Sequence, residues 1–229
     1  LIDGEHTPND LSTMLHHAQV LAAYPSVQAV ARVPLGLGHV GQMVIKQHLD
    51  LGIETLLVPM IDTAAQAAEV VRSMRYPPQG VRGMAGARAS RWGRYVNYPQ
   101  EANDRVCLLV QAETQTALDN LDAIAATEGV DGVFIGPADL SASMGHVGNA
   151  AHPRVQAAIE DGIRRITAAG KAAGILTTDE AQARRYLELG ATFVAVGLDH
   201  HVLSRGAAAL AAKFKNTAPQ PVSTGGNPY

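Results

Sequence analysis

Residues 106–139 read VCLLVQAETQTALDNLDAIAATEGVDGVFIGPAD, and they contain one complete unit of the pattern that fills the chain. An apolar run over 106–111 is followed by an Ala-rich amphipathic stretch over 115–126, and Gly129 precedes a second apolar run over 132–135. The apolar runs are short, rich in Val, Ile and Leu, and lack strict alternation, as expected for strands buried on both faces. A strand, a helix and a strand in this order predict parallel strands joined by a right-handed crossover.

The same unit repeats in both directions along the chain. Further apolar runs predict strands at 28–33, 55–58, 172–176 and 193–196. Amphipathic stretches predict helices at 11–23, 43–51, 64–74, 155–169 and 180–189. Glycines at 52, 129, 170 and 190 follow four of the predicted helices, where a left-handed residue commonly ends a helix. The sequence therefore predicts a parallel α/β protein with six strands, and residues 1–3 read as the end of a seventh.

The strand count leaves two closures open. Because the chain starts at the carboxyl end of a strand, we expect one strand and one helix to precede it, which would complete a (β/α)8 barrel, or TIM barrel. A seven-stranded doubly wound sheet is the alternative. Polar residues follow almost every strand, as on the catalytic face of a barrel, so the barrel is favoured. We expect residues 1–215 to form this single domain, and residues 216–229, rich in Pro, Gly and Ser, to be disordered.

The composition excludes several classes of protein. Of the 229 residues, 47% are hydrophobic and 17% charged, which is typical of a globular protein. A net charge of -3 argues against non-specific binding to nucleic acids or anionic membranes, since both need a basic field. The single cysteine, Cys107, lies in an apolar run, so it is expected to be an inert core thiol and excludes a disulfide framework. No apolar run reaches the roughly 18 residues that span a bilayer, and no signal peptide is visible, so we expect a cytoplasmic protein.

Two carboxylates follow neighbouring strands. Glu113 closes the segment 111–113 (Gln-Ala-Glu), and Asp139 closes the segment 136–139 (Gly-Pro-Ala-Asp). Since adjacent parallel strands end at one edge of a sheet, both side chains could bind one divalent cation, with water and substrate oxygens completing the octahedron that Mg²⁺ or Mn²⁺ prefers. Each carboxylate alone could instead cap the helix that follows it. The turn at 136–139 also offers backbone N–H groups to a carboxylate.

Charged residues also follow the first two strands. The segment 3–6 (Asp-Gly-Glu-His) holds an acid and His6 in a tight turn, an arrangement suited to a general base, although a surface His beside an acid is more often inert. Arg32 ends an apolar strand and must reach a polar partner, because burying an unpaired charge is costly. That partner is either a substrate carboxylate or a structural ion pair.

Two other segments have a possible function. The connection over residues 77–105 includes Arg82, Arg88, Arg91 and Arg94 and several glycines, and its length predicts an active-site loop that handles an anion. Residues 36–41 (GLGHVG) match the G-x-G-x-x-G dinucleotide fingerprint, with Asp62 about 20 residues further on. Because Pro34 separates the strand from this motif, a flexible glycine-rich loop is the favoured interpretation.

Several segments together resemble the HpcH/HpaI family of metal-dependent (class II) pyruvate aldolases, in particular its hydroxy-ketoacid aldolases. They are residues 1–6 (LIDGEH), 45–47, 50–52, 55–60 (TLLVPM), 75–78, 80–83, 88–92 and 130–141 (VDGVFIGPADLS). The first and last of these are specific when found together, and the resemblance runs from residue 1 to about residue 214. Residues 35–42 depart from the family pattern, being longer and Gly-rich.

The resemblance implies a (β/α)8 barrel that assembles as a hexamer and exchanges its C-terminal helix between subunits. It implies reversible aldol addition of pyruvate, or a close 2-ketoacid, to an aldehyde. It also implies a divalent metal (Mg²⁺, Mn²⁺ or Co²⁺) on Glu113 and Asp139, with no organic cofactor. No lysine follows a strand, where a Schiff-base aldolase would need one.

The resemblance further implies a role for each site residue. Arg32 would hold the pyruvate carboxylate and stabilise the enolate, and His6 would be the acid/base, with Asp3 orienting the site. Asp50 of a neighbouring subunit would pair with the catalytic His. Gln111 would lie behind the metal ligands or touch the ketoacid.

The backbone N–H groups of Ala138 and Asp139 would meet the substrate carboxylate. Two alternatives remain: an acyl-CoA thioester lyase of the citrate-lyase-like branch, and a non-catalytic metal-binding homologue. A CoA groove is not indicated by any segment of the sequence.

Overall fold

Residues 1–215 are described by a computed structural model, in which seven strands form one parallel sheet. The strands are β1 (Ile2–Asp3), β2 (Val30–Arg32), β3 (Thr55–Val58), β4 (Cys107–Ala112), β5 (Gly132–Ile135), β6 (Ala172–Leu176) and β7 (Phe193–Ala195). Each strand pairs with the next one along the chain. The predicted parallel α/β architecture is therefore confirmed. The segment 216–229 lies outside the described residues, so its disorder stays a prediction.

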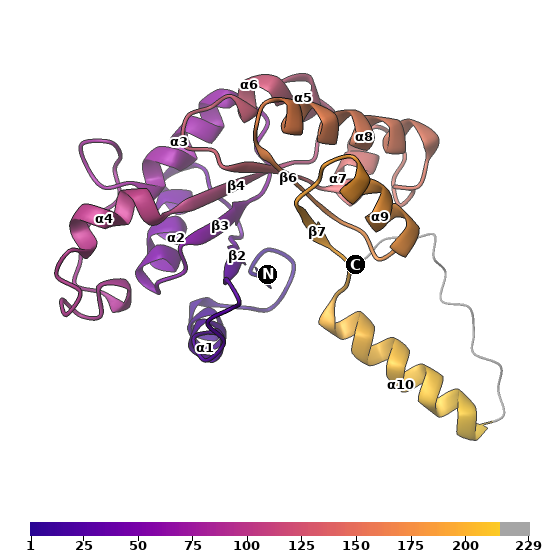
Figure 1. The fold of residues 1–229 in the computed structure, drawn as a ribbon, viewed down its shortest axis with the longest axis horizontal. Coiled ribbons are helices and arrows are strands. Elements are labelled where there is room, and N and C mark those ends of the chain that lie inside the picture. Colours follow the sequence, from indigo (N-terminus) through magenta and orange to yellow (C-terminus); the bar gives the residue numbers. More distant parts are fainter. Residues whose placement is uncertain (216–229) are drawn as a thin grey trace.

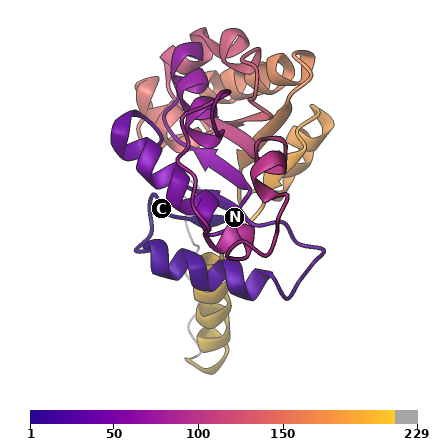
Figure 2. The same ribbon diagram turned by 90° about the vertical axis from the view of Figure 1, so that its left-hand side faces the viewer.

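The strand order distinguishes the two closures that the sequence leaves open. A doubly wound sheet reverses its strand order at a switch point, whereas this sheet adds every strand on the same side. The sheet also curls, with helices along its outer side (Figures 1 and 2). Within residues 1–215, β1 and β7 are the edges of an open sheet, so the observed fold is a curled partial barrel and not a closed one.

Helices alternate with the strands. They are α1 (Leu11–Leu21), α2 (Gly38–Asp50), α3 (Ala64–Met74), α4 (Tyr98–Arg105), α5 (Gln115–Asp119), α6 (Leu121–Ala125), α7 (Pro137–Ser143), α8 (Pro153–Ala168), α9 (Glu180–Glu188) and α10 (Asp199–Lys215), with a 3₁₀ turn η1 (Arg88–Ser90). Local capping explains where several begin. Asp10 accepts the Thr13 N–H at the start of α1, and Thr63 forms a capping box with Gln66 at the start of α3. No helix within residues 1–215 is long and apolar enough to cross a membrane.

Helix α2 begins at Gly38, five positions before the predicted start at Met43. The glycines that suggested a loop are needed for close packing instead. A Cβ on Gly41 would lie 2.1 Å from the carbonyl carbon of Gly36, and a Cβ on Gly36 would lie 2.1 Å from a methyl group of Val58. The prediction of a flexible glycine-rich loop over this segment is therefore wrong, because its glycines allow the start of α2 to pack against β3.

Two helices were not predicted, and one predicted helix is divided. Helix α4 has the sequence YPQEANDR, which has no apolar periodicity, and α7 is a short helix that begins at a proline. The predicted helix over 115–126 is broken at Asn120 into α5 and α6. None of these differences changes the order of the strands.

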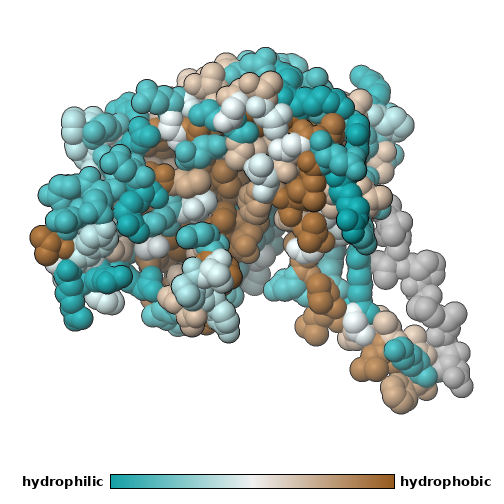
Figure 3. Space-filling view, in the orientation of Figure 1, coloured by the Kyte–Doolittle hydropathy of each residue, from teal (hydrophilic) through white to brown (hydrophobic). Residues whose placement is uncertain are grey.

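The sheet has an apolar cluster on each of its faces. Side chains of one strand parity pack against the helices in the main core, as Leu56, Val110 and Val133 do. The other parity faces the concave side, where Leu57 and Phe134 belong to a smaller cluster with a half-buried Cys107. Figure 3 shows hydrophobic residues in the middle of the molecule and hydrophilic residues over the outer helices. This alternation fixes which residues of each strand point to the hollow side of the sheet.

One buried histidine makes the stability of the fold depend on pH. His48 in α2 is buried, its Nδ1 lies 2.8 Å from the Val44 carbonyl oxygen, and its Nε2 has no hydrogen-bond partner among the described residues. Burial lowers the pKa of His48 below its usual 6.5, and the Val44 contact offsets only part of this. A base with a lowered pKa in the folded state is protonated more readily after unfolding, so stability is lost as the pH falls from about 6.5 towards the folded pKa.

We therefore expect His48→Leu to reduce the fall in melting temperature between about pH 7 and pH 5.5, because it removes the titrating group while preserving buried volume. Thermal unfolding across this range measures the slope. The matched control is His17→Leu on the exposed side of α1, which should leave the slope unchanged. Equal slopes for the wild type and the His48 variant would show that this histidine does not couple to folding.

Candidate active site

Polar side chains collect at the carboxyl edge of the curled sheet. Asp3 ends β1 and is the register neighbour of Arg32, the last residue of β2. Glu113 follows β4, and Asp139 lies in the first turn of α7, directly after β5. The junctions after β1, β2, β4 and β5 therefore contribute to one cluster, as expected when parallel strands end at a common edge.

Arg32 is held between two carboxylates. Its Nε and Nη2 donate to the two carboxylate oxygens of Asp3 at 2.7 and 2.6 Å, and its Nη1 lies 3.0 Å from Oε2 of Glu5. The arginine side chain is only 8% exposed, and both acids are largely buried. The ion pair that the sequence allowed for Arg32 is present, and it fixes the guanidinium in one orientation.

The two acids respond differently to this environment. Burial alone would raise the pKa of Asp3, but hydrogen bonds from Arg32 and from the Glu5 N–H outweigh it and leave the pKa below its usual range. Burial raises the pKa of Glu5, and the positive charge of Arg32 opposes this effect. The negative charges of Asp3 and Asp139 also raise the Glu5 pKa.

Glu113 is the most deeply buried acid of the cluster, with 2% of its surface exposed. Its Oε1 accepts the Met60 N–H at 2.8 Å, and its Oε2 accepts a hydrogen bond from Nε2 of Gln111. Burial raises the Glu113 pKa to about 7 despite these two hydrogen bonds, and the charges of Glu5 and Asp139 add to the rise. A positive ion beside these acids would offset both the burial and the repulsion.

Gly136 allows this close arrangement. A Cβ at this position would lie 2.4 Å from Oε2 and 2.8 Å from Cβ of Glu113. The glycine is also the N-cap residue of α7, and no side chain caps that helix. The first backbone N–H groups of a helix lack intrahelical partners, so those of Ala138 and Asp139 can donate hydrogen bonds to the carboxylate of a ligand.

We expect Gly136→Ala to lower turnover by roughly a hundredfold, because the new methyl group must displace Glu113 from its position. Turnover and the melting temperature should be measured together. Gly86→Ala provides the glycine control: no atom lies within 4 Å of its Cβ position, so it tests the general cost of an added methyl group. Full activity in Gly136→Ala would mean that the position of Glu113 does not matter.

The predicted acid/base residue lies at the rim of the cluster. The His6 side chain is 46% exposed, and its Nε2 lies 3.8 Å from Oε2 of Glu5. It follows the ion-paired acids by one to three residues, so it combines access to solvent with proximity to buried charge. A side chain in such a position can exchange protons with solvent and still reach the charged groups of the cluster.

Asp50 is not part of this cluster within one subunit. It is the last residue of α2, which precedes the amino end of β3, whereas the cluster is at the carboxyl ends of the strands. Its Oδ1 accepts a hydrogen bond from Nη2 of Arg82 at 2.8 Å. The structure thus places the predicted Asp50 against the connection over 77–105.

The connection over 77–105 also lies away from the cluster. It ends in α4, which leads into the first residue of β4, so it belongs to the amino end of the sheet. Arg82 is buried against Asp50, and Arg88 donates to the carbonyl oxygen of Leu51. Within the subunit the connection does not reach the cluster, and Arg82 and Arg88 anchor it to the end of α2.

The dinucleotide interpretation also fails on local geometry. The Gly38 N–H, which would face a pyrophosphate at the start of α2, donates to Oε1 of Glu69 at 2.7 Å. A carboxylate at this position repels a phosphate group. The fingerprint spacing is accounted for by packing of the glycines.

Two residues of the cluster were missed by the sequence analysis. Glu5 was considered only as part of the turn before His6, although its carboxylate contacts Arg32. Met60 contributes a backbone N–H to Glu113 and has a φ of 57°, a conformation that side chains other than glycine rarely adopt. A backbone donor leaves no signature in residue type, so Met60 could not have been identified from the sequence.

The donor set at this edge suits a hard cation better than zinc. Within residues 1–215, no group of three or more His, Cys, Asp and Glu side chains is arranged to hold a metal ion. Two carboxylates would leave most positions of an octahedral ion to water and substrate oxygens, which is typical of Mg²⁺ and Mn²⁺.

Comparisons with known proteins agree on one family. A family model described as HpcH/HpaI aldolase/citrate lyase matches residues 1–206. The chain is 60% identical over 223 residues to the hydroxypyruvate/pyruvate aldolase of Pseudomonas aeruginosa, covering 96% of this chain and 81% of that protein. It is 57% identical over 220 residues to the 4-hydroxy-2-oxo-heptane-1,7-dioate aldolase of Klebsiella pneumoniae, covering 95% and 81%. A solved HpcH/HpaI aldolase/citrate lyase family protein from Burkholderia cenocepacia has a TM-score of 0.88 and 38% identity, covering 93% and 84%.

Proposed function

Because this chain belongs to the HpcH/HpaI aldolase/citrate lyase family, we propose that it joins pyruvate, or a close 2-ketoacid, to an aldehyde in a reversible, metal-dependent reaction. Relatives at 57–60% identity over nearly the whole chain are named aldolases, and the chain is accordingly an aldolase, a carbon–carbon lyase. The product of the addition would be a 4-hydroxy-2-oxoacid. The observation that carries the mechanism is the convergence of Glu113, Asp139 and the ion-paired Arg32 at one edge of the sheet.

Glu113 and Asp139 would hold the metal ion. Their carboxylates are close enough for Asp139 to raise the Glu113 pKa, and Met60 and Gln111 fix both oxygens of Glu113. A bound Mg²⁺, Mn²⁺ or Co²⁺ would supply Lewis acidity to the keto oxygen of the substrate. The two protein carboxylates leave room in an octahedron for a chelating ketoacid.

Arg32 would bind and polarise the ketoacid. Since Asp3 and Glu5 hold its guanidinium rigidly, the positive charge is oriented before the substrate arrives. A preorganised charge of this kind stabilises the oxygen that becomes negative in the enolate without reorganisation at the moment of reaction. The N–H groups of Ala138 and Asp139, at the start of α7, would receive the substrate carboxylate.

His6 would move the proton between the aldol hydroxyl group and solvent. Its side chain is half-exposed at the rim of the cluster, so it can exchange protons with water between turnovers. Asp50 of a neighbouring subunit would face this histidine. Support for that assignment is that Arg82 holds the Asp50 carboxylate in one place, although Asp50 lies away from the cluster of its own subunit.

The alternatives are weaker. Neither relative described above is a CoA-ester lyase by name, so the citrate-lyase-like reaction is not favoured. A non-catalytic homologue would not need the ion-paired Arg32 and a Glu113 buried with two hydrogen bonds.

A direct assay tests the proposed function. Purified protein, treated with a chelator and then supplied with Mn²⁺ or Mg²⁺, should cleave 4-hydroxy-2-oxoacids to pyruvate and an aldehyde. Pyruvate release is followed by coupling to lactate dehydrogenase. Cleavage at the same rate in the chelator alone would contradict the metal-dependent mechanism.

We also propose that α10 packs on a second copy of the chain, in a hexamer of closed (β/α)8 barrels. None of its seventeen residues is buried, and it projects away from the sheet (Figure 1). Leu203, Leu210 and Phe214 are 74%, 58% and 83% exposed and recur at the spacing of one helix face. An isolated helix with such a face gains stability only when another surface covers it.

Leu210→Asp should therefore convert the hexamer to smaller species in light scattering coupled to gel filtration, because it places a charge in the apolar face of α10. Lys213→Asp, on the same helix, is the charge control and should leave the assembly intact. A wild-type protein that elutes as a monomer would contradict this part of the proposal.

A further inference from the structure

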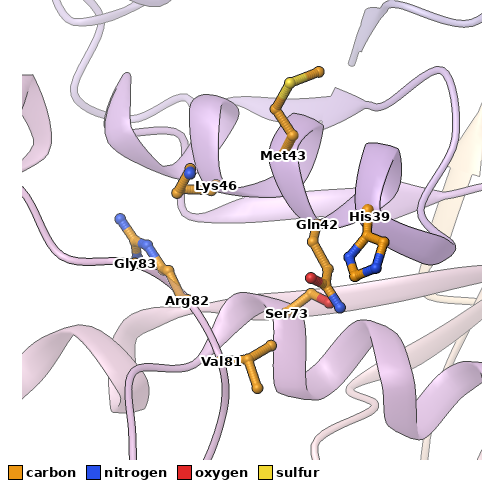
Figure 4. Close-up of a pocket in the computed structure, with 8 residues that line it drawn as sticks. All are labelled: His39, Gln42, Met43, Lys46, Ser73, Val81, Arg82 and Gly83. Atoms are coloured by element: carbon orange, nitrogen blue, oxygen red, sulfur yellow. The ribbon is translucent and has the colours of Figure 1, made fainter.

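A polar pocket of about 140 Å³ lies on the outer side of the fold, between α2, the end of α3 and the residues that follow α3 (Figure 4). None of its lining residues belongs to the catalytic cluster. Helix α2 contributes His39, Gln42 and Lys46 to its polar walls. The end of α3 and the segment that follows it contribute Ser73, Arg82 and Gly83. Figure 4 shows Lys46 and Arg82 on the same side of the opening, with Gln42 near Ser73.

Arg82 is a buried cation in the wall of this pocket. Its side chain is 1% exposed, its Nη2 donates to Asp50 and to the Tyr98 hydroxyl group, and its guanidinium lies 4.6 Å from the centre of the Tyr76 ring. Its Nε and Nη1 are buried and have no hydrogen-bond partner among the described residues. Buried donors without an acceptor are costly, so a ligand that supplies acceptor oxygens would be stabilised here.

Lys46 adds a second positive charge. It lies one turn before Asp50 on α2, and its stem passes over Gly83, where an added Cβ would lie 3.5 Å from Cδ of the lysine. Within residues 1–215, Lys46 has neither a hydrogen bond nor an ion pair. Asp50 forms an ion pair with Arg82 and balances the charge of that arginine, but the charge of Lys46 is left unbalanced.

The charge and size of the pocket together point to a class of ligand. Among the described residues, no Asp or Glu side chain lines the pocket, so Lys46 leaves its walls positive. A water-sized group occupies about 30 Å³, so the pocket has room for roughly five such groups, the number of heavy atoms in inorganic phosphate. Lys46 from α2 and Arg82 from the segment after α3 approach from two different elements, so an anion held between them would have oxygens facing both cations.

We propose that this pocket is a binding site for a phosphate-type oxyanion, either inorganic phosphate or the phosphate group of a monoester. The anion accepts hydrogen bonds from the unpartnered nitrogens of Arg82 and from Lys46. It thereby links α2 to the segment after α3. Because the pocket opens to the surface, the organic part of a monoester can remain in solvent.

Isothermal titration calorimetry of the full chain with inorganic phosphate tests the site, with sodium chloride at matched ionic strength as the blank. We expect millimolar-range binding to the wild type and a loss of roughly tenfold in affinity for Lys46→Gln, which keeps the stem and removes the charge. Lys213→Gln, an exposed lysine of α10, is the matched control and should bind phosphate as the wild type does. Glycerol phosphate serves as the monoester: binding of both anions identifies an open phosphate site, and binding of phosphate alone identifies a site for the inorganic ion.

Competition separates this pocket from the catalytic cluster. Saturating pyruvate with Mg²⁺ should leave the phosphate affinity within about twofold, since none of the residues that line the pocket is proposed to contact the ketoacid. The proposal is overturned by the absence of phosphate binding, by unchanged affinity in Lys46→Gln, or by displacement of phosphate by pyruvate. These outcomes do not depend on whether the protein is an aldolase.

Discussion

Replacement of Glu113 by Gln is expected to reduce aldol cleavage on the order of a thousandfold, the largest effect of any single substitution in the cluster. The reason is the loss of one of two anionic oxygens proposed to hold the metal ion, whose transition-state stabilisation amounts to several kcal/mol. The remaining Asp139 would bind the cation much more weakly. Metal affinity, measured by calorimetry with Mn²⁺, should fall together with the rate.

The same substitution should leave the fold intact. Gln at 113 is nearly isosteric, can still accept the Met60 N–H, and no longer carries a charge that burial disfavours. The amide of Gln111 can rotate to offer its Oε1, which has no partner among the described residues, to the new NH₂ group. In the presence of a chelator, we expect a melting temperature equal to or above that of the wild type. Glu128→Gln, at an exposed position, serves as the control for loss of a carboxylate.

Replacement of Arg32 by Ala has the second largest expected effect. A charge-assisted contact to the substrate carboxylate contributes about 1.5–3 kcal/mol, so pyruvate affinity should fall by roughly 10- to 150-fold. The variant also leaves Asp3 and Glu5 without their cationic partner, so its melting temperature should decrease. Pyruvate affinity is measured from competitive inhibition of cleavage.

Arg32→Lys separates the two consequences. Lysine keeps the positive charge but cannot reproduce the two parallel hydrogen bonds to Asp3, so we expect partial recovery of stability with little recovery of pyruvate affinity. Arg105→Ala removes an exposed pair with Glu54 and should change neither quantity. Unchanged pyruvate affinity in Arg32→Ala would exclude this residue from the substrate site.

The residues at the strand ends were predictable because chain direction and strand parity fix their positions. Once β4 and β5 are parallel neighbours, Glu113 and Asp139 must lie at the same edge, whatever the details of packing. The position of Arg32 followed from the same logic. The ion-pair partners of Arg32 could not be predicted in the same way. Asp3 and Glu5 lie in a short turn, where a side chain can point towards the arginine or away from it, and the sequence does not show which.

The errors have a common physical origin. Glycines at 36, 38 and 41 suggested a flexible loop, but glycine is also the residue that permits close approach of a helix to a strand, and the sequence does not distinguish the two uses. The arginines of 77–105 suggested an active-site loop, but Arg82 and Arg88 contact Asp50 and Leu51 at the end of α2 instead of the catalytic cluster. The sequence could not show whether the sheet closes, and within residues 1–215 β1 and β7 each pair with a neighbouring strand on one side only.

Exchange of the pyruvate methyl protons for deuterium, followed by NMR, tests the central claim most directly. Formation of the enolate requires only the ketoacid half of the site, so no aldehyde has to be assumed. We expect exchange with Mn²⁺, Co²⁺ or Mg²⁺, none above background in the presence of a chelator, and a loss of exchange in Glu113→Gln. Exchange that persists in the chelator, or that is absent with every metal ion, would contradict an enolate mechanism based on Glu113, Asp139 and Arg32.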